Sequence, residues 1–141
     1  MLENPTPDRL STPQEKIRWH RIKNHLKQDD VATCIGVSRT TYMKIDQGQD
    51  IILSPAQYDK LSLLFGVPAI ELLDEYNKFL YEGQGMHMKA YRKKHRLTQC
   101  ALAEMFSIQV QRVKRWEQDK NRMSKKWWEK IFGMVDSPQS N

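Results

Sequence analysis

The sequence predicts an all-α protein built from two small helical units. Apolar residues recur at steps of three and four along almost the whole chain, which is the spacing of one face of a helix. The sequence lacks the alternating runs of Val, Ile and Thr that are typical of strands. Its second half repeats the pattern of the first, and 141 residues suffice for two very small domains.

Residues 12–26 should form the first helix. Thr12 can cap its start, Pro13 suits the first helical position, and Glu15 can complete a capping box. The apolar residues that this helix is expected to bury are Ile17, Ile22 and Leu26.

Two short helices are predicted next, over 28–34 and 38–46. Gly36 lies between them, and glycine permits the positive φ that a tight turn between helices often requires. Ser38 can cap the second of the two helices.

Two further helices complete the first half. Ser54 and Pro55 open one of them, and Pro68 begins the other. The helix over 68–81 carries apolar residues around more than one narrow stripe, so we expect it to pack against two surfaces. The glycine-containing run over 82–85 then favours a linker.

The second half is expected to contain four helices. A basic helix over 86–96 precedes short helices near 98–105 and 109–118, and Ser124 caps the last helix. The predicted organisation is a flexible tail over 1–11, a five-helix domain over 12–82, a linker over 83–85, a four-helix domain over 86–134 and a flexible tail over 135–141.

Charge is distributed unevenly along the chain, whose formal net charge is +6. Residues 1–82 hold 10 Lys and Arg against 12 Asp and Glu, a net charge of −2. Residues 83–141 hold 13 against 5, a net charge of +8. The basic total suggests an anionic partner, but a nucleic-acid surface spread evenly along the chain would not give this asymmetry.

Several classes of protein are excluded. No uncharged apolar run approaches the roughly 20 residues that span a bilayer, and the N-terminus lacks the layout of a signal peptide, so a cytoplasmic location is expected. Cys34 and Cys100 form no CxxC pair and are expected to be small buried fillers. The histidines lack ligand spacing, so neither a metal nor a cofactor is expected. Catalytic motifs are not apparent, which argues against an enzyme.

The two halves repeat each other at a spacing of 71 residues, without a gap through two helices. Ala32 then meets Ala103, at a position where a small side chain lets two helices cross closely. Inward-facing positions also match: Val37, Tyr42 and Ile45 meet Ile108, Val113 and Trp116. Two helices that cross steeply through a short turn make a helix-turn-helix.

Both copies resemble the helix-turn-helix of phage-repressor-type (Cro/XRE family) proteins, whose core reads L-[ST]-Q-x-x-[VL]-A-x-x-[LI]-G-[VI]-S-x-x-x-[IV]-x-x-[WF]-E-x-G. The first copy is LKQDDVATCIGVSRTTYMKIDQG (26–48), and the second is LTQCALAEMFSIQVQRVKRWEQD (97–119). The resemblance covers about 17–81 and 86–134. It implies two lambda-repressor-like domains in tandem.

The departures from that pattern include two residues in the first copy and two in the second. In the first copy, Lys27 replaces the usual Ser or Thr cap, and Asp46 replaces the usual Glu. In the second copy, Ser107 and Asp119 replace two glycines. A left-handed serine costs about 1–2 kcal/mol, so we expect a wider turn there.

The resemblance implies that the second short helix of each unit enters a DNA major groove, with its N-terminal, outward residues at the base edges. These residues are Ser38, Arg39, Thr40, Thr41, Met43 and Lys44 in the first unit, and Gln109, Gln111, Arg112, Lys114 and Arg115 in the second. Gln28 and Gln99 would contact phosphate beside their helix N-termini. A cationic run would also contact phosphate, although such runs are often only solvated faces: Lys89, Arg92, Lys93, Lys94 and Arg96.

Two functions remain open at this point. The first is a sequence-specific regulator of transcription, most simply a repressor of phage or mobile-element type that binds duplex DNA. It could use both units, or one unit with a homodimer through helix 68–81 on an inverted-repeat operator. The second is a protein-interaction module on the same scaffold, such as an antitoxin or an inhibitor of a host nuclease, which could also bind its own promoter.

Overall fold

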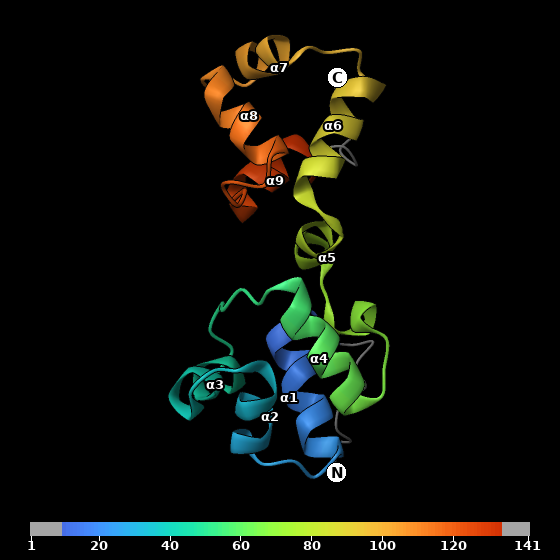
Figure 1. Ribbon diagram of the computed structural model, residues 1–141, viewed down its shortest axis with the longest axis vertical. Helices are drawn as coiled ribbons and strands as arrows, with labels where there is room; N and C mark the ends of the chain where they lie inside the picture. The colour runs from blue at the N-terminus through green and yellow to red at the C-terminus, as the bar shows by residue number, and fades with distance from the viewer. Residues whose placement is uncertain (1–9, 134–141) are drawn as a thin grey trace. The chain divides into compact units, whose positions relative to one another are not determined.

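The computed structural model describes residues 10–133, and within that range every regular element is a helix (Figure 1). The prediction of an all-α protein is therefore confirmed. The predicted tails over 1–11 and 135–141 lie outside the described residues, apart from residues 10 and 11. The chain divides into two compact units, the first ending at Lys78 and the second beginning at Phe79.

The first unit begins with α1 (Pro13–Lys23), whose start matches the prediction. The Thr12 side chain accepts a hydrogen bond from the backbone N–H of Glu15, and the Glu15 carboxylate accepts one from that of Thr12. Ile17 is buried as predicted, whereas Ile22 is 44% exposed. The helix ends earlier than expected because Asn24 caps it and His25 takes a positive φ of 58°.

A tightly packed helix pair follows, α2 (Gln28–Ile35) and α3 (Arg39–Asp46), and α4 (Pro55–Phe65) packs against α2. Figure 1 shows α2 and α3 next to α1. The core lies where these helices meet and contains Ile17, Val31, Ala32, Ile35, Tyr42, Ile45, Tyr58, Leu61 and Phe65.

The predicted single helix over 68–81 is wrong. The segment forms a short 3-10 helix, η2 (Ala69–Leu72), and then α5 (Glu75–Glu82). Leu73 between them is extended, with φ −107° and ψ 148°. The Asp74 carboxylate accepts hydrogen bonds from the backbone and side-chain nitrogens of Asn77, each at 2.8 Å. Asp74 thus caps a new helix inside a run of apolar residues. Its side chain bonds to the backbone in competition with a continuous helix, and the apolar pattern does not reveal this.

The second unit contains α6 (Gln84–Lys94), α7 (Gln99–Met105), α8 (Val110–Glu117) and α9 (Lys125–Ile131). Where the sequence predicts a linker, Gln84 and Gly85 instead form the first turn of α6, and both are buried. The helices α6, α7 and α8 begin 71 residues after α1, α2 and α3, so the sequence repeat is also a repeat of helix starts.

The turns repeat in the same register. Gly36 and Ser107 both have positive φ, 73° and 56°, and Gly48 and Asp119 have 83° and 58°. The turn hydrogen bonds also recur: Gly36 N–H donates to Thr33 O at 3.2 Å, and Ser107 N–H donates to Glu104 O at 3.1 Å. The expected wider turn at Ser107 is therefore wrong, because serine adopts the left-handed geometry that glycine adopts in the first unit.

Candidate nucleic-acid interface

In the first unit, packing fixes which face of α3 is free. Tyr42 and Ile45 are 0% and 1% exposed and point into the core beside Val31 and Ala32 of α2. Ser38 caps the helix by accepting a hydrogen bond from the backbone N–H of Thr41 at 3.0 Å. The start of α3 is thereby capped, and the face opposite Tyr42 and Ile45 is left to solvent.

The predicted base-reading residues of the first unit lie on that free face. Arg39, Thr40, Met43 and Lys44 are exposed, and Thr41 is half-buried. The Ser38 hydroxyl donates to the Thr41 hydroxyl at 3.0 Å, so both hydroxyls already take part in the helix start. The Arg39 guanidinium lies 3.8 Å from the Asp29 carboxylate.

In the second unit, α8 is amphipathic. Val113 and Trp116 are 0% and 3% exposed, as predicted for core residues. Of the predicted DNA-binding residues, four are exposed and Lys114 is half-buried; the exposed ones are Gln109, Gln111, Arg112 and Arg115. Gln109 precedes the helix without capping it through its side chain.

Two indole rings lie close to the Arg112 guanidinium. Its Cζ atom lies 5.7 Å from the ring centroid of Trp116 and 5.4 Å from that of Trp127, which is on α9. Trp127 and Trp128 are both half-buried. Stacking against an indole restrains a guanidinium but leaves its N–H edges available for hydrogen bonds.

In each unit a largely buried polar network connects the helix pair to the helix before it. Sequence analysis did not predict this network. In the first unit Arg21 of α1 donates to Asp46 at 2.8 Å and to the Leu26 carbonyl at 2.9 Å. Gln28 donates to the same Asp46 oxygen at 2.9 Å. The arginine, the glutamine and the carboxylate thus join three consecutive helices.

The second unit has the same network 71 residues later. Arg92 donates to both Glu117 oxygens, at 2.5 Å and 3.0 Å, and to the Leu97 carbonyl at 3.1 Å, while Gln99 donates to Glu117 at 3.0 Å. Burial raises the pKa of Glu117, but the hydrogen bonds from Arg92 and Gln99 outweigh burial and hold the pKa below its ordinary value.

Three of the predicted phosphate contacts take part in these networks. The side-chain nitrogens of Gln28 and Gln99 are directed at carboxylates, and Arg92 is half-buried against Glu117. The rest of the predicted cationic run is exposed: Lys89, Lys93, Lys94 and Arg96. The sequence does contain a sign of these networks. The repeat aligns Arg21 with Arg92 and Asp46 with Glu117, so each unit has an arginine and a carboxylate at equivalent positions.

The departures from the repeat pattern have local explanations. The Asp30 carboxylate accepts a hydrogen bond from the backbone N–H of Lys27 at 2.7 Å, which partly replaces the missing cap. The Asp119 carboxylate accepts one from the backbone N–H of Gly85 at 3.0 Å. Cys100 is exposed and Cys34 is half-buried, so the expectation of two buried fillers is wrong.

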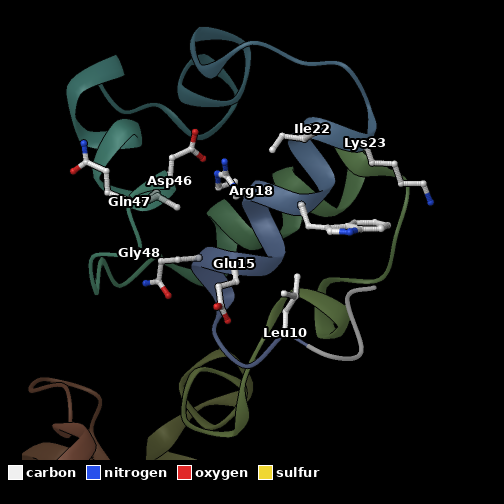
Figure 2. A pocket seen from close by; sticks show the side chains of 11 residues that line it. Leu10, Glu15, Arg18, Ile22, Lys23, Asp46, Gln47 and Gly48 are labelled. Atoms are coloured by element: carbon white, nitrogen blue, oxygen red, sulfur yellow. The ribbon is translucent and has the colours of Figure 1, made fainter. Parts of the chain in front are cut away.

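A groove of about 700 Å³ lies between α1 and the end of α3, away from the predicted base-reading residues. Figure 2 shows labelled side chains entering it from both elements. Its lining residues are Leu10, Gln14, Glu15, Arg18, Trp19, Ile22, Lys23, Ile45, Asp46, Gln47 and Gly48.

Two features are absent from the described residues. Residues 10–133 contain no cluster of three or more His, Cys, Asp or Glu side chains that could hold a metal ion. In that same part of the chain, no helix combines the length and the apolar character needed to cross a bilayer.

Comparison with known proteins links the chain to a phage repressor. It is 37% identical over 62 residues to the cryptic phage CTXphi transcriptional repressor RstR of Vibrio cholerae. The similar region makes up 43% of this chain and 53% of that protein, so the chain spans about half the length of the curated relative it matches. No family model matches the chain, and no solved structure matches it. The chain is thus a partial relative of a phage transcriptional repressor.

Proposed function

We propose that this chain is a sequence-specific, double-stranded-DNA-binding transcriptional regulator, a repressor of phage or mobile-element type with two helix-turn-helix units of the Cro/XRE kind in tandem. One observation carries the proposal: in each unit, a buried helix pair leaves the polar N-terminal residues of its second helix on a free face. That is the arrangement by which a recognition helix enters the major groove. The similarity to a phage repressor supports the same function.

The proposed chemistry follows from the side chains on those faces. Arg39 and Arg112 can each donate two hydrogen bonds to guanine O6 and N7. Gln111 can pair with adenine N6 and N7, and Thr40 can contact a thymine methyl group. Exposed lysines and Arg96 would contact phosphates and make the affinity sensitive to salt.

The proposal extends to a homodimer on an inverted-repeat operator, in the cytoplasm where such DNA is found. Segment 68–81 would contribute to the dimer contact, although most of its apolar side chains are buried within their own unit. Ile70, at 52% exposed, and Leu63 of α4, at 86% exposed, are large apolar side chains open to a partner. Sedimentation at several concentrations, with Ile70→Ser and Leu63→Ser beside the wild type, tests this contact.

The decisive experiment measures binding to the DNA upstream of the protein's own gene across a salt series. Wild type, Arg39→Ala and Arg112→Ala are compared by footprinting and equilibrium titration. We expect a protected inverted repeat, and the loss of sequence preference in one or both variants without unfolding. Two outcomes would contradict the proposal: sequence preference unchanged in both variants, or a stable complex with a host protein and no specific DNA. The latter would favour the protein-interaction module.

A further inference from the structure

Because the two helix pairs superpose in sequence register, the charge at each equivalent position can be compared directly. In the stretch from the start of α1 to residue 55, seven Lys and Arg stand against five Asp and Glu. In the equivalent stretch from the start of α6 to residue 126, twelve stand against three. The net charges are therefore +2 and +9 on two copies of the same scaffold.

The acids of the first unit lie where DNA would be approached. Asp29 is in the first turn of α2 and is 65% exposed, and its carboxylate lies 3.8 Å from Arg39 at the start of α3. The only arginine at the start of that helix thus faces a carboxylate before any DNA is bound. A second acid, Asp30, is also exposed in the same turn. Phosphates that approach this face meet negative charge.

The second unit has no acid at either position. Cys100 and Ala101 occupy the places of Asp29 and Asp30. Arg112 of α8 is bounded by the indoles of Trp116 and Trp127 rather than by a carboxylate, so its charge is not neutralised. The loop after α8 adds Lys120 and Arg122, where the first unit has Gln49 and Ile51.

We infer that the second unit is the one that reads the DNA, with Arg112 on α8 as its principal base contact, and that the equivalent face of the first unit stays off the duplex. This inference rests on the proposed function and adds which surface carries it. Counterion release from phosphates supplies much of the affinity of such proteins, and it scales with the number of cations at the surface. The unit whose repeated stretch has a net charge of +9 is therefore expected to outcompete the unit whose stretch has +2 for the same duplex.

The test places a carboxylate at the matched position of the second unit. Cys100→Asp in the full chain recreates the acid that the first unit carries at Asp29. Position 100 is exposed, and an acid in the first turn of a helix is favourable, so the variant should keep its fold. Cys100→Ala is the control for loss of the thiol, and Asp29→Ala is the matched change in the first unit.

Affinities are measured on duplexes selected by the wild-type chain from a random-sequence library, with an unrelated duplex of equal length alongside. We expect Cys100→Asp to weaken binding by at least about tenfold, and Cys100→Ala and Asp29→Ala to change it by less than about threefold. Arg112→Gln should abolish the preference for the selected duplex, while Arg39→Gln keeps it. Circular dichroism confirms that each variant is folded.

The outcomes separate this inference from the function on which it rests. If the wild type distinguishes no selected duplex from the unrelated one, the proposed function itself is wrong. If the wild type does distinguish them but Arg39→Gln loses the preference and Arg112→Gln keeps it, the first unit reads the DNA. In that case the inference is overturned and the proposed function stands. Equal losses in both variants would also overturn it, because both faces would then lie on the duplex.

Discussion

At the scale of single residues, the second unit has non-glycine residues with positive φ at two positions where the first unit has glycine. Ser107 and Asp119 have φ of 56° and 58°, at the positions of Gly36 and Gly48. An L-residue in this region is disfavoured by contact between its Cβ atom and the backbone. Asp119 gains a hydrogen bond from Gly85 in this conformation, whereas the structure gives Ser107 no comparable side-chain contact among the described residues.

Ser107→Gly should therefore stabilise the second unit. The left-handed strain is relieved, and the greater freedom of glycine in the unfolded chain offsets part of the gain, which leaves roughly 0.5–1 kcal/mol. Urea unfolding followed by tryptophan fluorescence measures the change. Gly36→Ser is the matched control in the first unit and should be destabilising by a similar amount. A loss of stability in Ser107→Gly would mean that the serine side chain has a role that its contacts do not reveal.

Glu117 should make the stability of the second unit depend on pH. Its pKa is lower in the folded chain than the ordinary value of 4.5, so the unfolded chain binds more protons as the pH falls. The stability that this carboxylate contributes is present above pH 4.5 and is lost as the pH falls below it. Urea midpoints measured between neutral and acidic pH should show this loss in the wild type.

Glu117→Gln is the comparison. It should be less stable than the wild type at neutral pH, and its urea midpoint should fall less as the pH is lowered. Arg92→Ala leaves the buried carboxylate without its cation and should cost about 3 kcal/mol at neutral pH. Equal acid responses in wild type and Glu117→Gln would show that other carboxylates govern the transition.

Sequence reasoning succeeded at residues whose environment is set by periodicity and failed at residues whose partner is distant. Burial of Tyr42, Val113 and Trp116 followed from their spacing on one helix face. The pairing of Arg92 with Glu117 spans 25 residues and depends on how three helices meet, which periodicity does not contain. From the sequence alone, Arg92 is therefore interpreted as one more exposed cation of the run that begins at Lys89. The roles of the outward residues in DNA binding stay predictions.

At the scale of elements, α6 begins at a close approach between its first turn and the end of α8. A Cβ atom on Gly85 would lie 2.4 Å from the Glu117 carbonyl oxygen and 2.9 Å from an Asp119 carboxylate oxygen. Next to it, Gln84 accepts a hydrogen bond from the backbone N–H of Met123 at 2.8 Å and donates to the Trp116 carbonyl at 3.2 Å. The start of α6 thus fixes the loop that follows α8.

Gly85→Ala should destabilise the second unit by about 1–3 kcal/mol, because backbone atoms stand where the methyl group must go. Loss of the hydrogen bond from Gly85 to Asp119 would add to the effect. Thermal unfolding by circular dichroism checks this, with Gly133→Ala as the control. The nearest atoms to a Cβ at Gly133 are side-chain carbons of Glu129 at 3.4 Å and 3.6 Å, which can move. Equal midpoints for the two variants would contradict the close approach.

The same contact explains why the linker prediction failed over 83–85. Glycine and glutamine between two apolar stretches are typical of a flexible connection, and nothing nearby in the sequence indicates burial. The partners of Gln84 lie more than thirty residues further on, so only the folded unit reveals why a glutamine and a glycine are needed there. Helix starts with strong local signals, such as the capping box at Thr12, were predicted correctly.

At the scale of the whole molecule, the two units differ more in charge than in architecture. Among described residues, the first unit holds nine Lys and Arg against nine Asp and Glu, and the second holds thirteen against five. Helical class and repeat spacing could be predicted because periodicity and register extend over the whole chain. The boundary between the two units falls inside α5 and could not be predicted, because it depends on which unit Tyr76 and Phe79 each pack into.

Salt should therefore stabilise the units unequally. Sodium chloride screens the repulsion among the cations of the second unit, whereas the first unit has no excess charge to screen. We expect amide hydrogen exchange of buried amides on α8 to slow between low and moderate salt more than that of amides on α3. The first unit serves as the internal control for general effects of salt. Equal slowing in both units would show that self-repulsion does not limit the stability of the second.

The gapless spacing of 71 residues makes the two helix pairs exchangeable parts. Positions 40, 41, 43 and 44 of α3 correspond one for one to Gln111, Arg112, Lys114 and Arg115 of α8, and both helices are eight residues long. Transplanting these four side chains onto α3 requires neither insertion nor deletion. A hybrid chain of this kind would present the outward side chains of α8 in both units. If α8 reads the DNA, as we infer, the first unit of the hybrid would gain the preference for the half-site that the second unit prefers.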